Sequence, residues 1–70
     1  MNMQIVVTDV RPGARFRQQR TTIVLVIDEI VNGIVFFYEI NSLGELSPTK
    51  SDQFSSFLYA LNVAQYEKID

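Results

Sequence analysis

The sequence predicts an α+β fold in which a small, curled antiparallel sheet of three to five strands carries one helix in the C-terminal half of the chain. Two observations predict it: β-branched and aromatic runs flank an Asn-Gly pair, and a helical spacing of apolar residues follows residue 50. The composition, 47% hydrophobic and 20% charged, is typical of a globular chain. No linker or repeat divides the sequence, so residues 1–70 are predicted to form one small domain.

The first twenty residues are predicted to form a strand and a loop. Residues 4–10 contain the β-branched residues Ile5, Val6 and Val7 and are followed by Pro12-Gly13, which is typical of a strand that ends in a turn. Residues 11–20 are polar and rich in arginine, with Phe16 as their apolar anchor. We expect a loop with a few extended residues that packs Phe16 into the core.

The clearest pattern is a hairpin formed by residues 21–31 and 34–41. Asn32-Gly33 between them favours positive φ angles at both positions of a type I′ turn, which joins two strands through two residues. Such a turn fixes which residues lie opposite one another. The predicted pairs are Val31 with Ile34, Glu29 with Phe36, Ile27 with Tyr38, and Leu25 with Ile40.

This register divides the hairpin into two faces that are both apolar. The predicted core face carries Ile23, Leu25, Ile27, Val31, Ile34, Phe36, Tyr38 and Ile40, interrupted by Glu29. The opposite face carries Val24, Val26, Asp28, Ile30, Val35, Phe37, Glu39 and Asn41. Because this second face is too apolar for water alone, it needs a cover, which a helix of the same chain, barrel curvature or a second chain could provide.

The rest of the chain is predicted to contain a short strand at residues 45–47, a helix and an extended tail. Pro48 ends the strand, and Thr49 or Ser51 can cap the helix. Its apolar stripe follows the i, i+3, i+4, i+7 spacing and consists of Phe54, Phe57, Leu58 and Leu61. Asn62 suits a left-handed residue at the helix end. For residues 64–69 we favour a closing strand over a frayed extension of the helix.

The composition argues against catalysis. The chain has no histidine and no cysteine, so it lacks the commonest general base, the thiol nucleophile and the usual zinc ligands. Asp28 and Glu39 share a predicted face, but two carboxylates without amide ligands make a poor metal site. We therefore predict no enzyme, no metal site and no cofactor. The sequence shows no secretory signal and no apolar run near the roughly 20 residues that span a bilayer, which predicts a cytoplasmic protein without membrane contact.

The net charge of −2 conceals a basic segment. Arg11, Arg15, Arg17 and Arg20 lie within ten residues, whereas residues 21–70 carry two lysines and seven acids. The cluster is a candidate for contacting nucleic-acid phosphates. The simpler interpretation is a solvated loop whose guanidinium groups pair with acids of the same domain. Of the three consecutive aromatic residues, only Phe37 lies opposite the predicted core face, which leaves little surface for stacking bases.

Residues 10–61 resemble a class of short phage and prophage proteins. The resemblance lies in Val10-Arg11-Pro12-Gly13-Ala14-Arg15-Phe16-Arg17, the apolar strand after it, Val35-Phe36-Phe37-Tyr38, and Ser51 leading to Phe54 and Phe57-Leu58. Proteins of this class are thought to form SH3-like small barrels that end in a helical turn, and they have no settled activity. The resemblance implies a phage protein that acts in the host cytoplasm by binding and blocking host machinery, including defence systems.

Three functional hypotheses follow. The first is a non-enzymatic inhibitor, similar to an anti-CRISPR protein, that binds a larger host protein or complex, with a homodimer left open. Its interface would consist of Val24, Val26, Asp28, Ile30, Val35, Phe37 and Glu39. The second is a small nucleic-acid-binding barrel that holds phosphates with Arg11, Arg15, Arg17 and Arg20. The third is a virion assembly or structural subunit.

Overall fold

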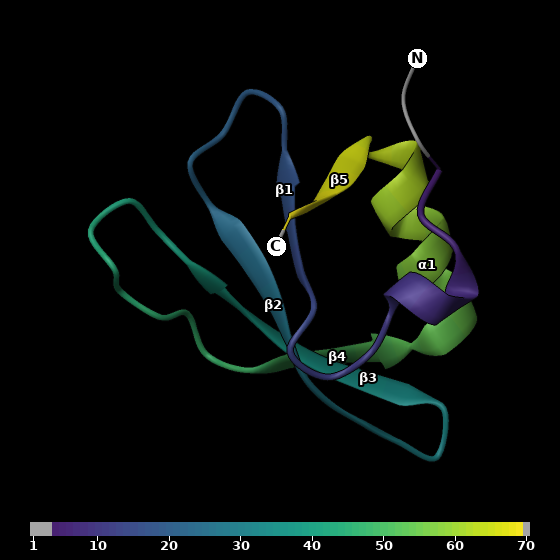
Figure 1. Cartoon of the computed structure of the whole chain (residues 1–70). Helices are drawn as coiled ribbons and strands as arrows, with labels where there is room; N and C mark the ends of the chain where they lie inside the picture. Colours follow the sequence, from purple (N-terminus) through teal and green to yellow (C-terminus); the bar gives the residue numbers. More distant parts are fainter. Residues whose placement is uncertain (1–3, 70) are drawn as a thin grey trace.

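The structure is a computed structural model that describes residues 4–69. Its elements are η1 (Val7–Asp9), β1 (Arg15–Gln18), β2 (Val24–Val31), β3 (Ile34–Ile40), β4 (Lys50–Gln53), α1 (Phe54–Val63) and β5 (Tyr66–Ile69). The five strands form one antiparallel sheet in the order β4-β3-β2-β1-β5, so the last strand in sequence pairs with the first. Figure 1 shows this sheet curling into a half-barrel, with α1 and the N-terminal segment together on one side. The predicted α+β class is confirmed.

The N-terminal segment differs from its prediction. Residues 4–10 contain the 3-10 turn η1 instead of a strand. The carboxylate of Asp9 accepts the Val6 N–H at 2.9 Å, and the Asp9 N–H donates to the Val6 carbonyl at 2.9 Å. These local bonds satisfy the backbone without a partner strand. The first strand of the sheet is β1, within the segment predicted as a loop, and its Phe16 is buried as expected.

The hairpin turn is confirmed, but the register changes half-way along the strands. Asn32 and Gly33 have φ angles of 50° and 75°, as a type I′ turn requires. The pairs Val31–Ile34 and Glu29–Phe36 are present as predicted. The register then shifts between Ile27 and Glu29, because Asp28 is an extra, unpaired residue in β2. Beyond such a β-bulge, each residue of β2 lies opposite the β3 residue one position before the one that the turn alone would assign. Cross-strand neighbours predicted to share a face therefore lie on opposite faces.

The predicted pairs beyond the bulge are therefore wrong. Ile27 lies opposite Phe37 instead of Tyr38, and Leu25 lies opposite Glu39 instead of Ile40. The buried core cluster consists of Ile5, Val10, Ala14, Phe16, Leu25, Ile27, Val35, Phe57 and Leu61. Ile30, Phe37, Phe54, Leu58 and Tyr66 pack against it. Phe36 and Tyr38, which were predicted to be core residues, do not belong to either group.

The segment after the hairpin also differs in detail. Residues 45–47 contribute an isolated bridge between Ile40 and Leu46, and the fourth strand is β4, a few residues later. Since β4 includes Ser51 and Asp52, α1 begins only at Phe54 and has no side-chain N-cap bond. The predicted helix and its apolar stripe are present, but its predicted capping residues are wrong.

The end of α1 is bonded to the N-terminal segment and leads into the last strand of the sheet. The left-handed residue is Gln65, with a φ of 59°, and not Asn62 as predicted. Asn62 instead accepts the Ile5 N–H and donates to the Ile5 carbonyl through its side chain, both at 2.9 Å. After this turn β5 pairs with β1, so the predicted closing strand is confirmed.

Candidate functional site

The outer face of the sheet, which lies opposite the core, carries two rows of side chains that cross the central strands. Residues that lie directly opposite each other in a sheet project from the same face. One row consists of Arg15, Val26 and Tyr38, and the next of Arg17, Val24 and Ile40. On β5 these rows continue with Ile69 and Glu67. The arrangement places two arginines beside an aromatic and aliphatic surface.

The burial of Val26 supports this assignment. Its side chain is only 8% exposed, yet it does not belong to the core cluster under α1. It therefore faces outward, between Arg15 and Tyr38 in the row, where long neighbouring side chains can shield it from water. A long arginine side chain can cover apolar surface in this way while its guanidinium stays in water.

Phe36 adds a second aromatic side chain to the same face. It is two residues from Tyr38 on β3, and alternate residues of a strand project from one side. Its neighbours across the strands are Glu29 on β2 and Ser51 on β4. Phe37 points the other way, where its ring lies 4.8 Å from the ring of Phe57 in α1. The expectation that only Phe37 would lie opposite the core is therefore wrong, and the bulge at Asp28 is the reason.

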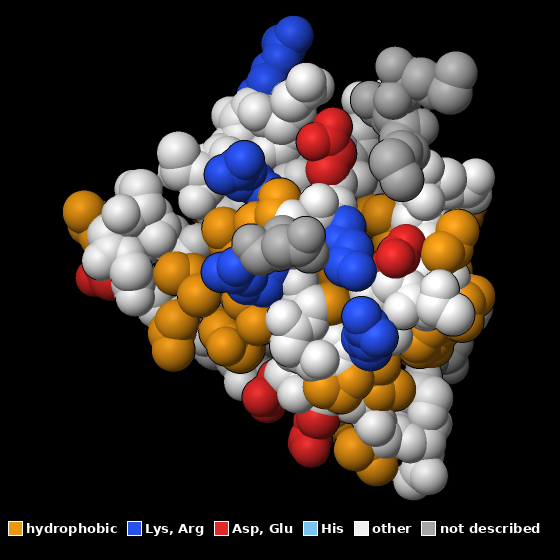
Figure 2. Space-filling model, in the orientation of Figure 1, with side chains coloured by type: hydrophobic (Ala, Val, Ile, Leu, Met, Phe, Trp, Pro, Cys, Tyr) orange, Lys and Arg blue, Asp and Glu red, His pale blue; other side chains and the backbone are white. Residues whose placement is uncertain are grey.

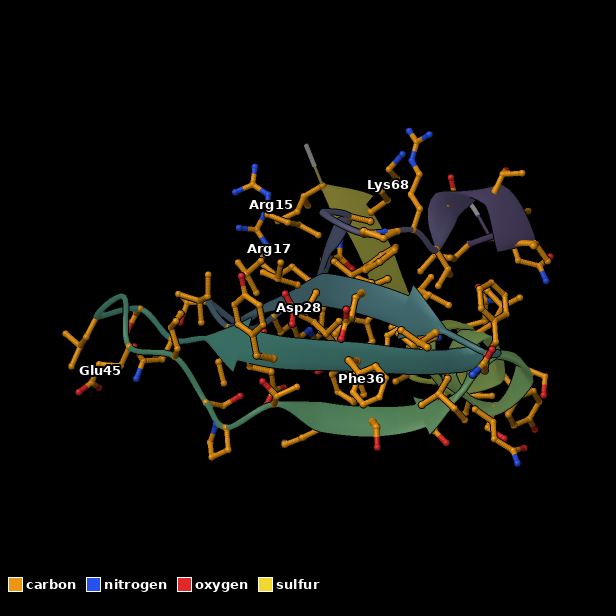
Figure 3. The ribbon with its side chains drawn as sticks, turned by 90° about the horizontal axis from the view of Figure 1, so that it is seen from below. Arg15, Arg17, Asp28, Phe36, Glu45 and Lys68 are labelled. Carbon is orange, nitrogen blue, oxygen red and sulfur yellow. The ribbon has the colours of Figure 1, made fainter. Side chains whose placement is uncertain are left out.

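Together, Arg15, Arg17, Phe36 and Tyr38 form what we call the arginine–aromatic face. Figure 3 shows Arg15 and Arg17 extending in the same direction from the sheet, whereas Phe36 lies lower in the view, beyond the ribbons of β2 and β3. Figure 2 shows Lys and Arg side chains gathered near the middle of one side of the molecule, next to hydrophobic side chains. A basic group of side chains beside apolar surface thus exists locally in a chain whose formal net charge is −2.

No arginine forms an ion pair with an acid among residues 4–69, although Glu67 lies directly opposite Arg17 and shares its face. Among residues 4–69 the ion pairs are Lys50 with Glu39, at 3.2 Å, and Lys68 with Asp9, at 3.8 Å. Neither involves an arginine, which counts against the interpretation of the cluster as a set of internal ion pairs. Arg11 lies beside Arg15 at a shared depression, whereas Arg20 lies in the β1–β2 connection at a different one. The structure therefore brings Arg11, Arg15 and Arg17 to one region and leaves Arg20 apart.

The predicted protein interface does not form a single surface. Its seven residues are Val24, Val26, Asp28, Ile30, Val35, Phe37 and Glu39. Val24 and Val26 are on the outer face, and Asp28 is exposed at the bulge. The other four face the core side, where Val35 is 0% exposed and Ile30 and Phe37 pack against the core. Val35, Ile30 and Phe37 are covered by the core and are not available to a partner. Asp28 and Glu39 do not lie together on one face.

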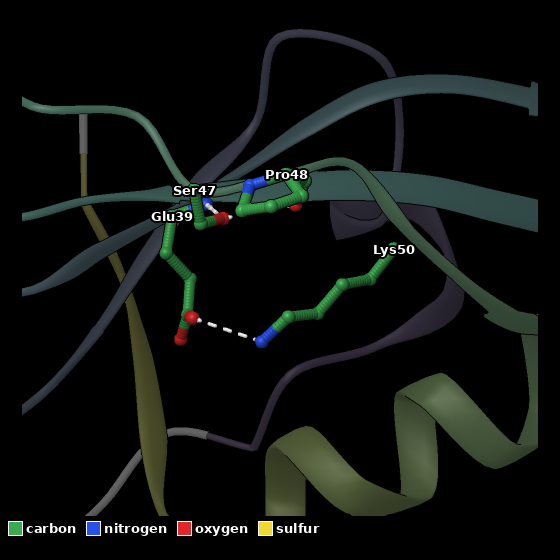
Figure 4. Close-up of polar contacts among 4 residues, drawn as sticks. All are labelled: Glu39, Ser47, Pro48 and Lys50. Carbon is green, nitrogen blue, oxygen red and sulfur yellow. Dashed lines mark hydrogen bonds and ion pairs between the residues drawn. The ribbon is translucent and has the colours of Figure 1, made fainter.

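Glu39 instead belongs to a polar cluster at one end of the core side. Its N–H donates to the Ser47 hydroxyl at 2.9 Å, and that hydroxyl donates to the Pro48 carbonyl at 3.0 Å. Its carboxylate pairs with Lys50 (Figure 4). Burial raises the pKa of the nearby Tyr66 phenol; the Glu39 charge raises it further, and Lys50 opposes this. The arrangement fixes the β3–β4 connection.

An apolar and acidic depression of about 440 Å³ lies next to this cluster. Ile23, Glu39, Glu45 and Leu46 contribute to its lining. Leu46 is 65% exposed, and Leu43 in the same connection is 82% exposed. Sequence reasoning missed this surface, although two leucines within a turn segment rich in Gly, Ser and Asn were an available signal.

Comparison with protein-family models, curated proteins and solved structures found no significant match to this chain. Among the helices of residues 4–69, none has the length and hydropathy that crossing a membrane requires.

Proposed function

We propose that the protein is a non-enzymatic binding module that holds single-stranded nucleic acid on its arginine–aromatic face. The observation that supports the proposal is the row Arg15–Val26–Tyr38, which places a cation and an aromatic ring on the same face, with Phe36 farther along β3. Cations that contact phosphates and rings that stack on bases are the two elements from which such surfaces are built. Bases in a duplex are already stacked on each other, so the rings favour a single strand.

The expected affinity is modest and depends on salt. Stacking contributes about 1–3 kcal/mol per base, and the surface offers two rings. Each phosphate contact to a single strand adds roughly −0.7 to the slope of log K against log salt, so the two arginines of the face give a slope of about −1.4. Since the chain as a whole is acidic, long-range attraction is weak and the contacts must act locally.

The first test is fluorescence anisotropy with a labelled oligothymidylate, starting near 50 mM salt. We expect the double change Arg15→Ala and Arg17→Ala to weaken binding and to reduce the salt slope by about 1.4, because two phosphate contacts are lost. The matched control is Arg15→Lys with Arg17→Lys, which keeps both charges and should keep most of the slope. No binding by the unmodified protein at low salt would overturn the proposal.

A second variant tests the aromatic part. Tyr38→Ala should weaken binding by about 5- to 150-fold, the loss expected for one stacked base, whereas Tyr38→Phe should retain it. Equal binding by all three proteins, with duplex and single strand bound alike, would show that the rings are not used.

A second candidate function is docking to a larger protein, the role that the phage resemblance implies. It is supported by the exposed Leu43 and Leu46 beside an acidic depression, which would suit a basic and apolar segment of a partner. Changing both leucines to serine should abolish such docking without affecting oligonucleotide binding, so the two candidates can be tested separately.

A further inference from the structure

We propose that a basic pocket beside the arginine–aromatic face binds the terminal phosphate monoester of the strand, an inference that rests on the proposed nucleic-acid function. The pocket has a volume of about 350 Å³ and lies between the loop before β1 and the end of β5. Arg11, Arg15 and Lys68 line it together with the apolar Pro12 and Ile69. Three cationic residues from three separate parts of the chain thus contribute to the lining of one depression.

The charge of the pocket matches a monoester better than an internal phosphate. Lys68 is paired with Asp9 at 3.8 Å, so three cations and one carboxylate leave two positive charges among the described residues. The Asp9 carboxylate also accepts the Val6 N–H at 2.9 Å. A phosphate monoester carries about −1.5 to −2 at neutral pH, whereas a diester within the strand carries one charge. The terminal group is therefore the better electrostatic partner.

The side chains are the main source of hydrogen bonds, because the backbone N–H groups of Gly13 and Ala14 are already in use and Pro12 has none. The Gly13 N–H donates to the Ile27 carbonyl at 2.8 Å, and the Ala14 N–H donates to the Arg11 carbonyl at 3.0 Å. Pro12 has no N–H. A guanidinium can bind two phosphate oxygens at once, so Arg11 and Arg15 are the principal ligands.

Arg15 connects the pocket to the stacking surface. It lines the pocket and also begins the row that continues through Val26 to Tyr38. Neighbouring strands are about 4.8 Å apart, so the backbone positions of Arg15 and Tyr38 are separated by roughly 10 Å. A strand whose end lies in the pocket can therefore place one of its first bases on Tyr38.

The experiment compares oligothymidylates of about eight nucleotides that carry a 5′-phosphate, a 3′-phosphate or only hydroxyl ends. We expect one phosphorylated form to bind about tenfold more tightly than the hydroxyl form. Arg11→Ala should remove this preference and leave the affinity for the hydroxyl form within about twofold, while Arg11→Lys should retain part of it. Circular dichroism of each variant verifies that the exposed change leaves the fold intact.

The outcomes separate this inference from the proposed function. If all three oligonucleotides bind equally and Arg11→Ala changes nothing, the terminal-phosphate pocket is wrong and the nucleic-acid function stands. If no oligonucleotide binds, the nucleic-acid function and the pocket's place in it are both wrong. In that case inorganic phosphate, titrated while NMR signals of Arg11 and Lys68 are followed, decides whether the pocket is a site for small phosphate compounds.

Discussion

The β2–β3 hairpin has a tip half next to Asn32-Gly33 and a base half on the other side of Asp28. The two halves differ in how well the turn predicts which residues pair. In the tip half, next to Asn32-Gly33, the observed pairs follow directly from the two-residue turn. In the base half the pairs are displaced by one residue, although no glycine or proline interrupts either strand there. Asp28, the residue of β2 without a partner in β3, separates the two halves. A turn therefore specifies the register of a hairpin only as far as the first bulge.

The displacement decides what the base half can do. It places Leu25 and Ile27 in the core with Phe37, and it turns Val26 and Tyr38 outward beside Arg15. Without the bulge, Phe36 and Tyr38 would be expected in the core and Phe37 outside. The candidate binding surface thus combines Val26 of β2 with Phe36 and Tyr38, which share one face of the regular strand β3.

The largest expected effect contrasts a core residue of the base half with an exposed residue of the tip half. Ile27 is 1% exposed and Val31 is 45% exposed. Ile27→Ala should lower the free energy of unfolding by about 2–5 kcal/mol, because it leaves a cavity in the core. That is a large part of the roughly 4–10 kcal/mol expected for a domain of this size. Val31→Ala should cost about 0.5 kcal/mol or less. Urea unfolding followed by circular dichroism measures both, and similar losses would contradict the assigned faces.

A deletion sharpens the same comparison. Removing Asp28 takes away the one residue without a partner, so Ile27 and Glu29 keep their places opposite Phe37 and Phe36. We expect the protein to fold with a loss of about 1–2 kcal/mol, since only the local curvature of the bulge is lost. The matched control is deletion of Ile30, which removes a paired residue from the tip half and should prevent folding. Two deletions of equal effect would show that Asp28 is not the extra residue.

The sequence was informative wherever one local pattern determined the result. Asn32-Gly33 predicted the turn, and the apolar stripe ending at Leu61 predicted α1. Phe16 was predicted to be buried because it is a large apolar side chain in a polar segment. The bulge could not be predicted, because Asp28 fits a regular strand as well as it fits a bulge when no partner strand is known. The surface that combines Arg15 and Arg17 with Phe36 and Tyr38 depended on that bulge, so only the arginines were candidates from the sequence.

The N-terminal strand was a different kind of error. Its β-branched residues satisfied the propensity for a strand, but Asp9 supplied a local acceptor for Val6, and Asn62 bound the backbone of Ile5. The available edge of β1 was taken by β5 instead. Propensity describes how a segment fits a sheet, whereas which segment joins the sheet is a competition among distant parts of the chain.

The smallest expected effect concerns the core side of the base half, where Glu39 and Lys50 lie near Tyr66. Burial raises the pKa of the Tyr66 phenol above its ordinary value of 10.0, and Glu39 raises it further. A raised pKa in the folded state means that the folded protein holds its proton when the unfolded chain has lost it. The stabilisation is therefore complete below the unfolded pKa and is lost as the pH rises through the raised folded pKa. In urea unfolding between about pH 9 and 11, Tyr66→Phe should lose less stability than the unmodified protein, because it has no phenol to ionise. Tyr59→Phe is the matched control, since it removes a phenol that is exposed on α1. If Tyr66→Phe and Tyr59→Phe gave the same pH dependence, Tyr66 would not be buried against the base half of the hairpin.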